Sequence, residues 1–193
     1  MVSTLTIHLR LPAKGAGRTL RKKRAAPLNS NVRRLTMPFV SEELIEKTWK
    51  KMGAFEGPGI QKLQKRHQKS QKALTKFVYS FLDDFSEDTC GILLFIYHVI
   101  AEAFENVKPR PKRVSKPQIE KVIEDLEART SRSTTESIER SPEPFALKYV
   151  YEALTEENDV VLSNSEIASI FALHEVVIEC LNRACLRDSD NSA

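Results

Sequence analysis

The stretch SEELIEKTWKKM, residues 41–52, has a counterpart in SKPQIEKVIEDL, residues 115–126. Two shorter pairs follow in the same order: KFVYSFL resembles KYVYEAL 72 residues later, and LFIYH resembles IFALH 76 residues later. Self-similarity at a nearly constant spacing indicates a duplicated structural unit. We therefore predict an all-α fold in which two tandem three-helix repeats form one compact six-helix bundle.

The three pairs also predict how the 193-residue chain is organised. They place repeat one at residues 41–107 and repeat two at residues 115–187, within a helical domain that covers 37–187. Residues 108–114 contain two prolines and four basic side chains. Because proline interrupts helices and the charges favour contact with water, we interpret this segment as a linker.

Capping residues and apolar stripes predict the six helices. Ser41, Ser86 and Ser115 are suited to cap the helices that follow them. The third and sixth helices are the most continuously apolar, so we expect them at the centre, and we expect Trp49 in the core beside them. Residues 129–140 are interpreted as frayed helix or loop. The predicted helices cover residues 42–52, 58–82, 86–107, 115–128, 141–157 and 164–186.

The two ends of the chain are predicted to lie outside the domain. We expect residues 1–36 to form a disordered basic arm and residues 188–193 a disordered tail. Neither segment has regularly spaced apolar residues whose burial could offset the entropy lost on ordering. The first 41 residues carry nine Lys or Arg and no Asp or Glu. The arm is open to three interpretations: a nucleic-acid contact, a signal for organelle import, or a segment upstream of a true start at Met37. We otherwise expect a cytoplasmic location.

Basic side chains gather on one face of the second predicted helix. Residues 57–82 carry six basic and no acidic side chains, whereas residues 117–193 carry seven basic and sixteen acidic ones. The basic face, with the adjoining 108–116 segment, is a candidate contact for nucleic acid or an acidic partner. The competing interpretation is a solvated face balanced by the acidic second half. The candidate contact residues are Lys62, Lys65, Arg66, Lys69, Lys72, Lys76, Lys108, Arg110, Lys112 and Arg113.

Two histidines hold matching positions in the third and sixth predicted helices. If the repeats pack about a shared axis, His98 and His174 meet near the centre, with Glu102 one turn after His98. This central polar pair suggests either a metal or acid–base site inside a bundle or two hydrogen-bonded core histidines. The Glu-x-x-His spacing of di-iron bundles is missing, so we assign no metal ligands and no cofactor.

No catalytic motif stands out from the sequence. Gly-rich loops, nucleophile elbows and His-Glu-x-x-His runs are lacking, so no catalytic residue is assigned and a non-enzymatic role is favoured. The longest apolar stretch is too short to span a bilayer, so no membrane partner is expected. We interpret Cys90, Cys180 and Cys185 as reduced, buried thiols.

The predicted function is a helical protein-interaction or adaptor protein, with a protein partner or homodimer. The alternatives are a nucleic-acid-binding protein and a metal-binding helical bundle.

Overall fold

The computed structural model describes residues 38–55, 57–129, 133–156 and 160–186, and all regular structure within them is helical. This confirms the all-α class. The sequence predicts six helices, whereas the described residues contain eight α-helices and one 3-10 turn. They are α1 (Glu42–Gly53), α2 (Gly57–Ser70), α3 (Lys72–Tyr79), η1 (Leu82–Asp84), α4 (Glu87–Glu105), α5 (Lys116–Glu127), α6 (Thr134–Arg140), α7 (Pro144–Thr155) and α8 (Asn164–Leu186).

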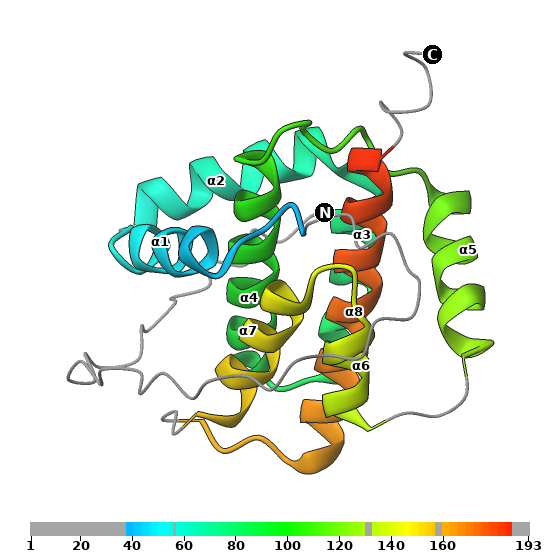
Figure 1. Cartoon of the computed structure of the whole chain (residues 1–193). Coiled ribbons are helices and arrows are strands. Elements are labelled where there is room, and N and C mark those ends of the chain that lie inside the picture. Colours follow the sequence, from blue (N-terminus) through cyan, green and yellow to red (C-terminus); the bar gives the residue numbers. More distant parts are fainter. Residues whose placement is uncertain (1–37, 56, 130–132, 157–159, 187–193) are drawn as a thin grey trace.

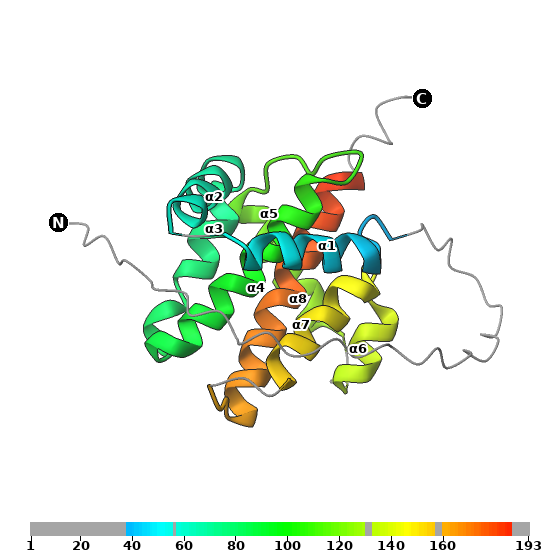
Figure 2. The same cartoon turned by 90° about the vertical axis from the view of Figure 1, so that its left-hand side faces the viewer.

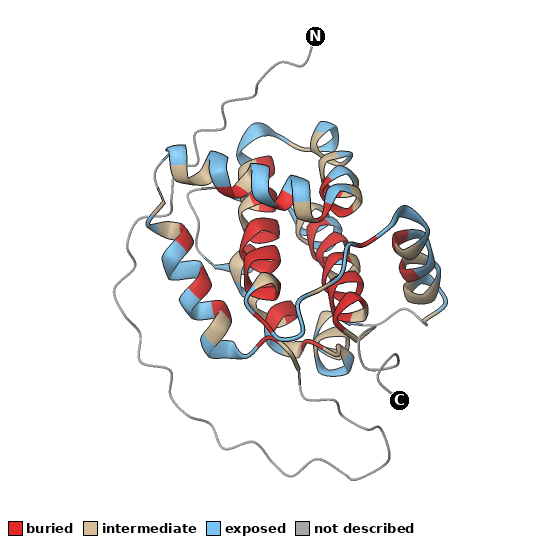
Figure 3. Cartoon of the chain, turned by 90° about the horizontal axis from the view of Figure 1, so that it is seen from above, coloured by how far each residue is buried: buried red, intermediate tan, exposed pale blue. Residues whose placement is uncertain are grey.

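The core is built around α4 and α8, which lie side by side and run in the same direction (Figure 1). Thr89 near the start of α4 donates a hydrogen bond to Glu166 near the start of α8. At the other end, the backbone N–H of Lys112, a few residues beyond α4, donates to the carbonyl of Ala184. Both helices are apolar on most of their circumference and are buried accordingly (Figure 3).

The remaining helices enclose this pair. α1 and α7 pack against α4 and each other, α5 packs against α8, and α2 lies across the C-terminal end of α4 (Figures 1 and 2). The prediction that Trp49 is a core residue is wrong, since its side chain is 40% exposed. In α1 the buried positions are Ile45, Thr48 and Met52. Residues 48 and 49 both border the apolar stripe of α1, and Thr48, not Trp49, faces the core.

The long second helix predicted over residues 58–82 is divided at Gln71. This residue leaves the helical region, with φ −125° and ψ 52°, and separates α2 from α3. Its buried side chain donates to the carbonyl of Lys112 (3.1 Å) and accepts from the N–H of Val114 (2.9 Å). The segment predicted to be a solvated linker is therefore attached to the domain, and Val114 is buried.

Three further expectations concern the second half and the ends of the chain. Part of residues 129–140 is helical, as α6. Cys90, Cys180 and Cys185 are buried and unbridged, as expected. The basic arm at 1–36 and the tail at 188–193 lie outside the described residues. In the described part of the chain, no helix is both long enough and apolar enough to cross a membrane.

Candidate functional site

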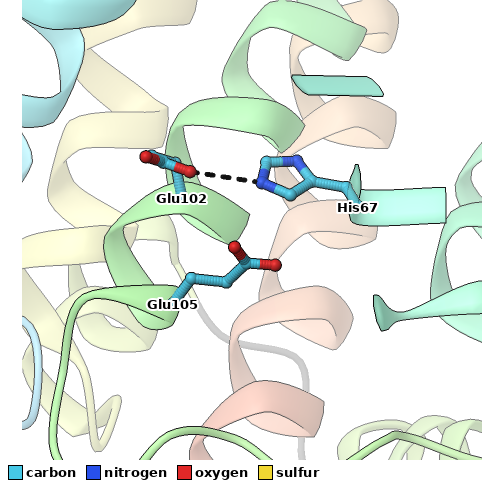
Figure 4. A group of neighbouring side chains, drawn as sticks. All are labelled: His67, Glu102 and Glu105. Atoms are coloured by element: carbon cyan, nitrogen blue, oxygen red, sulfur yellow. Dashed lines mark ion pairs between the residues drawn. The ribbon is translucent and has the colours of Figure 1, made fainter. Parts of the chain in front are cut away.

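A buried polar cluster lies where α2 crosses the end of α4. α2 contributes His67, and α4 contributes His98, Glu102 and Glu105 (Figure 4 shows the first of these with the two glutamates). The exposed fraction is 0% for His67, 1% for His98 and 3% for Glu102, while Glu105 is half-buried. The spacing of 98, 102 and 105 places these three side chains on one side of α4. α2 then covers them.

Two basic side chains neutralise the carboxylates. Arg66 forms an ion pair with Glu102 and another with Glu105, the second at 3.0 Å between Nε and Oε2. Lys51, from α1, reaches Glu102 at 3.0 Å. The side chains of Arg66 and Lys51 are about half exposed, at 49% and 53%. A buried carboxylate is expensive to leave unpaired, so this arrangement lets Glu102 stay charged inside the fold.

The two histidines of the cluster are in direct contact. Their Nδ1 atoms are 2.9 Å apart, so one ring donates a hydrogen bond from its Nδ1–H and the Nδ1 of the other ring accepts it. Burial above all, and then the nearby His98 and Arg66, lower the pKa of His67 to about 3. Burial lowers the pKa of His98 to about 4. Both rings are therefore neutral at pH 7. Among the described residues, neither Nε2 atom has a hydrogen-bond partner.

The structure brings together His98 and Glu102 from the predicted polar pair but places His174 elsewhere. His174 is fully buried in α8, where its Nδ1 donates to the carbonyl of Ile170 at 2.7 Å. The partner of His98 is His67, which sequence reasoning missed. The signal was available, because His67 follows Leu63 by four residues and therefore lies on the apolar stripe of α2.

The predicted basic residues fall into two groups. Arg66 belongs to the buried cluster, and the other nine are exposed or partly so. The linker lies against the α2–α3 junction, because Arg113 donates to the carbonyl of Lys69 at 3.3 Å and Gln71 bonds to the linker backbone. Two basic segments far apart in sequence thus form one surface. Within the described residues, no carboxylate lies within ion-pair distance of Lys62, Lys65 or Lys69.

An open groove of about 640 Å³ lies between α3, α5 and α8, and sequence reasoning did not predict it. Its apolar lining comes from all three helices and the turn after α3. Asp84 and Glu166 also line it, and no basic residue does so within the described part of the chain. Asp83, Glu87 and Asp88, which are close to Asp84 in the sequence, are also exposed. The apolar and small lining residues are Phe77, Phe81, Phe85, Ile123, Ser165, Ser169, Ala172, Leu173 and Val176.

Of these features, the buried cluster holds the groups able to bind a metal ion: His67, Glu102 and Glu105. The groove is suited to an apolar side chain or helix, and the basic surface to phosphate or carboxylate groups. No protein-family model matches the chain, and neither do the curated proteins or the solved structures with which it was compared. The function therefore has to be inferred from these three features.

Proposed function

We propose that this protein is a non-enzymatic helical interaction protein whose α3–α5–α8 groove binds a basic amphipathic helix of a partner protein. The observation that carries this proposal is the combination of an apolar lining with an acidic end. Phe77, Phe81 and Phe85 offer aromatic surface, and α8 contributes small side chains together with Val176. An amphipathic helix in a groove inserts apolar side chains spaced at helical intervals.

Charge selects the kind of helix that would bind. The segment 83–88 carries four exposed acidic side chains and no basic one. A partner helix with Lys or Arg beside its apolar stripe would place those cations against this end, whereas an acidic helix would be repelled. Because the apolar contacts supply most of the affinity, binding is expected to survive moderate salt.

The test uses a short helical peptide of Leu and Lys, with Leu at i, i+3, i+4 and i+7, and a matched peptide with Glu in place of Lys. Ala172 lines the groove and Ala168, on the same helix, does not, and both are exposed. Fluorescence anisotropy should show binding of the Lys peptide only. Ala172→Lys should weaken it by about tenfold or more, while Ala168→Lys leaves it unchanged.

Equal effects of Ala172→Lys and Ala168→Lys would overturn the assignment of the groove. Self-association of the unmodified protein in analytical ultracentrifugation, lost in Ala172→Lys, would also overturn the proposal of a partner helix. In that case the groove would bind a second copy of the chain.

A nucleic-acid-binding role is the second candidate, favoured by the meeting of the linker with the α2–α3 junction. Lys69 and Lys72 from the helices and Lys112 and Arg113 from the linker are brought onto one surface by the Gln71 and Arg113 hydrogen bonds. A continuous cationic surface displaces counterions from phosphates, so its affinity falls steeply with salt.

Replacing five lysines of α2 and α3 by Gln separates the two candidates. Arg66 is left in place because it neutralises the buried glutamates. Helix propensity barely changes, so the fold should persist. Under the interaction proposal the variant keeps its affinity for the Lys peptide. Tight, salt-sensitive binding of the unmodified protein to mixed-sequence RNA or DNA, abolished in this variant, would favour the second candidate. The lysines are Lys62, Lys65, Lys69, Lys72 and Lys76.

The tandem duplication remains a prediction within this proposal. It is supported by reciprocal packing, since α1 contacts α4 and α7 while α5 contacts α8 and α3. The two halves nevertheless differ in detail. α2 has 14 residues where the corresponding α6 has 7, and Tyr79 is half-buried where Tyr151 is 39% exposed. A helical repeat protein offers extended grooves without needing catalytic groups, as an adaptor requires.

A further inference from the structure

The buried cluster contains a set of ligands that converge on one point. One ring nitrogen of His67 and one carboxylate oxygen each from Glu102 and Glu105 all lie within 4.8 Å of one another. Figure 4 shows the imidazole of α2 facing the two glutamates of α4. The cluster lies apart from the groove, so its chemistry is independent of the proposed function.

The separation of His67 from Glu102 is more typical of two metal ligands than of a hydrogen-bonded pair. Nε2 and Oε2 are 3.5 Å apart, and Nε2 makes no hydrogen bond although the side chain is fully buried. Good N–H···O hydrogen bonds have donor–acceptor distances of about 2.7–3.2 Å. Two ligands of one tetrahedral ion, each bound at roughly 2.1 Å, lie about 3.4 Å apart. The observed distance fits that geometry.

His98 is placed to orient the ligand histidine. A metal-binding imidazole usually donates its second N–H to a neighbouring group, which fixes the tautomer. The Nδ1 contact of 2.9 Å between His67 and His98 supplies such a partner. When His67 donates from Nδ1, its Nε2 carries a lone pair directed at the glutamates. Ser70 similarly donates to Glu105 at 2.8 Å and fixes that carboxylate.

Arg66 pairs with the same two carboxylates that would bind a metal ion, so its guanidinium would compete with the ion. It pairs with Glu102 and Glu105 together, yet its side chain is 49% exposed and has room to turn into solvent. Of the two glutamates, Lys51 pairs with Glu102 and not with Glu105 among the described contacts, so its position is compatible with an ion bound between the three ligands. The mixture of imidazole and carboxylate ligands favours zinc-class ions over Ca²⁺ and Mg²⁺, which prefer oxygen ligands throughout.

We propose that His67, Glu102 and Glu105 form a binding site for a divalent transition-metal ion of the zinc class, and that Arg66 neutralises the two glutamates when the ion is absent. The proposal has a directional consequence. Removing a ligand weakens metal binding, whereas removing the competing guanidinium strengthens it. A cluster that serves only to stabilise the fold would respond to neither change in this way.

The experiment is calorimetric titration of the full chain with Zn²⁺ against a competing chelator. The unmodified protein should bind a single ion per chain. Glu105→Gln should weaken binding and Arg66→Gln should tighten it, each by about tenfold or more. His174→Gln is the matched control, because His174 is equally buried but bonds to a backbone carbonyl instead. It should leave the affinity unchanged.

Two further measurements distinguish a change in metal binding from an effect of the substitution on folding. Saturating Zn²⁺ should raise the Tm of Arg66→Gln more than that of Glu105→Gln, since stabilisation by a ligand grows with the logarithm of its concentration divided by Kd. Co²⁺ bound in place of Zn²⁺ should show no sulfur-to-cobalt charge-transfer band, because the ligands contain no thiolate. A thiolate band, equal affinities in all three variants, or no binding to either the unmodified protein or Arg66→Gln would each overturn the proposal.

Discussion

The buried histidines differ in what surrounds them, and this difference determines how each contributes to stability. His67 and His98 bond to one another, whereas His174 donates to the carbonyl of Ile170. Burial lowers the pKa of His174 to about 4, although the carbonyls of Ile170 and Leu93 favour its protonated form. Its ring is therefore a neutral packing element of α8 that also donates a hydrogen bond to a backbone carbonyl.

His174→Ala should destabilise the protein much more than Lys69→Ala. Truncating the buried side chain leaves a cavity and removes its hydrogen bond to the Ile170 carbonyl, which together cost about 2 kcal/mol or more. Lys69 is exposed, and its replacement should stay within about 0.5 kcal/mol. Urea unfolding of the two variants measures the difference. Small and equal losses would contradict the central position of α8.

The lowered pKa of His174 also predicts how its contribution depends on pH. The folded pKa, about 4, lies below the ordinary value of 6.5, so the fold favours the neutral ring. This contribution is complete above pH 6.5 and is lost as the pH falls towards 4. Between pH 7.5 and pH 5 the loss is about 2 kcal/mol. The stability difference between wild type and His174→Gln should shrink by that amount, and a difference independent of pH would contradict it.

At the scale of elements, the side chain of Gln71, the residue between α2 and α3, stabilises the break between these two helices. Gln71 bonds to the backbone of the linker through both ends of its amide group, and no residue of the α2–α3 segment that surrounds it forbids a helix. Competition from these tertiary hydrogen bonds, and not local propensity, separates the two helices.

Gln71→Ala should therefore loosen the linker. The buried N–H of Val114 loses its acceptor, at a cost of roughly 1–3 kcal/mol. Gln68→Ala, on the exposed face of α2, is the matched control and should stay within about 0.5 kcal/mol. Amide hydrogen exchange at Val114 should accelerate only in Gln71→Ala. Unchanged exchange would show that the linker is held by other contacts.

The same elements show how far the sequence predicts the structure. Helix class, caps such as Ser41 and Ser86, and the burial of α4 and α8 follow from local patterns that depend on few residues. The break at Gln71 and the pairing of His67 with His98 do not, because both depend on which helices meet in space. His98 and Glu102 could be selected as site residues, and the spacing from Leu63 could place His67 on the buried side of α2, but its contact with His98 could not be predicted.

For the whole molecule, a buried carboxylate connects the segment before α1 to the second half of the chain. Glu143 is 0% exposed and accepts from the N–H groups of Phe39 and Val40 at 2.9 and 3.0 Å. It thereby joins the segment before α1 to the start of α7. Burial raises the pKa of Glu143 to about 6, although the two N–H donors favour its charged form.

Two truncations test this boundary. A chain beginning at Met37 should keep the Tm of the full chain, since the predicted core contains no residue before it. A chain beginning at Ser41 removes buried Val40 and both donors to Glu143, and its Tm should fall by roughly 5–10 °C. Differential scanning calorimetry compares them. A large fall already at Met37 would show that the preceding residues take part in the fold.

The parallel arrangement of α4 and α8 makes the two ends of the molecule electrically different. The acidic segment 83–88 and Glu166 lie at the N-terminal ends of both helices, and the basic linker lies beside both C-terminal ends (Figure 1). Among the described residues, these charged side chains give the bundle an electric moment along its axis. A charged surface therefore exerts a torque on it before any contact forms. It approaches an anionic surface with the linker foremost and a cationic surface with the groove foremost.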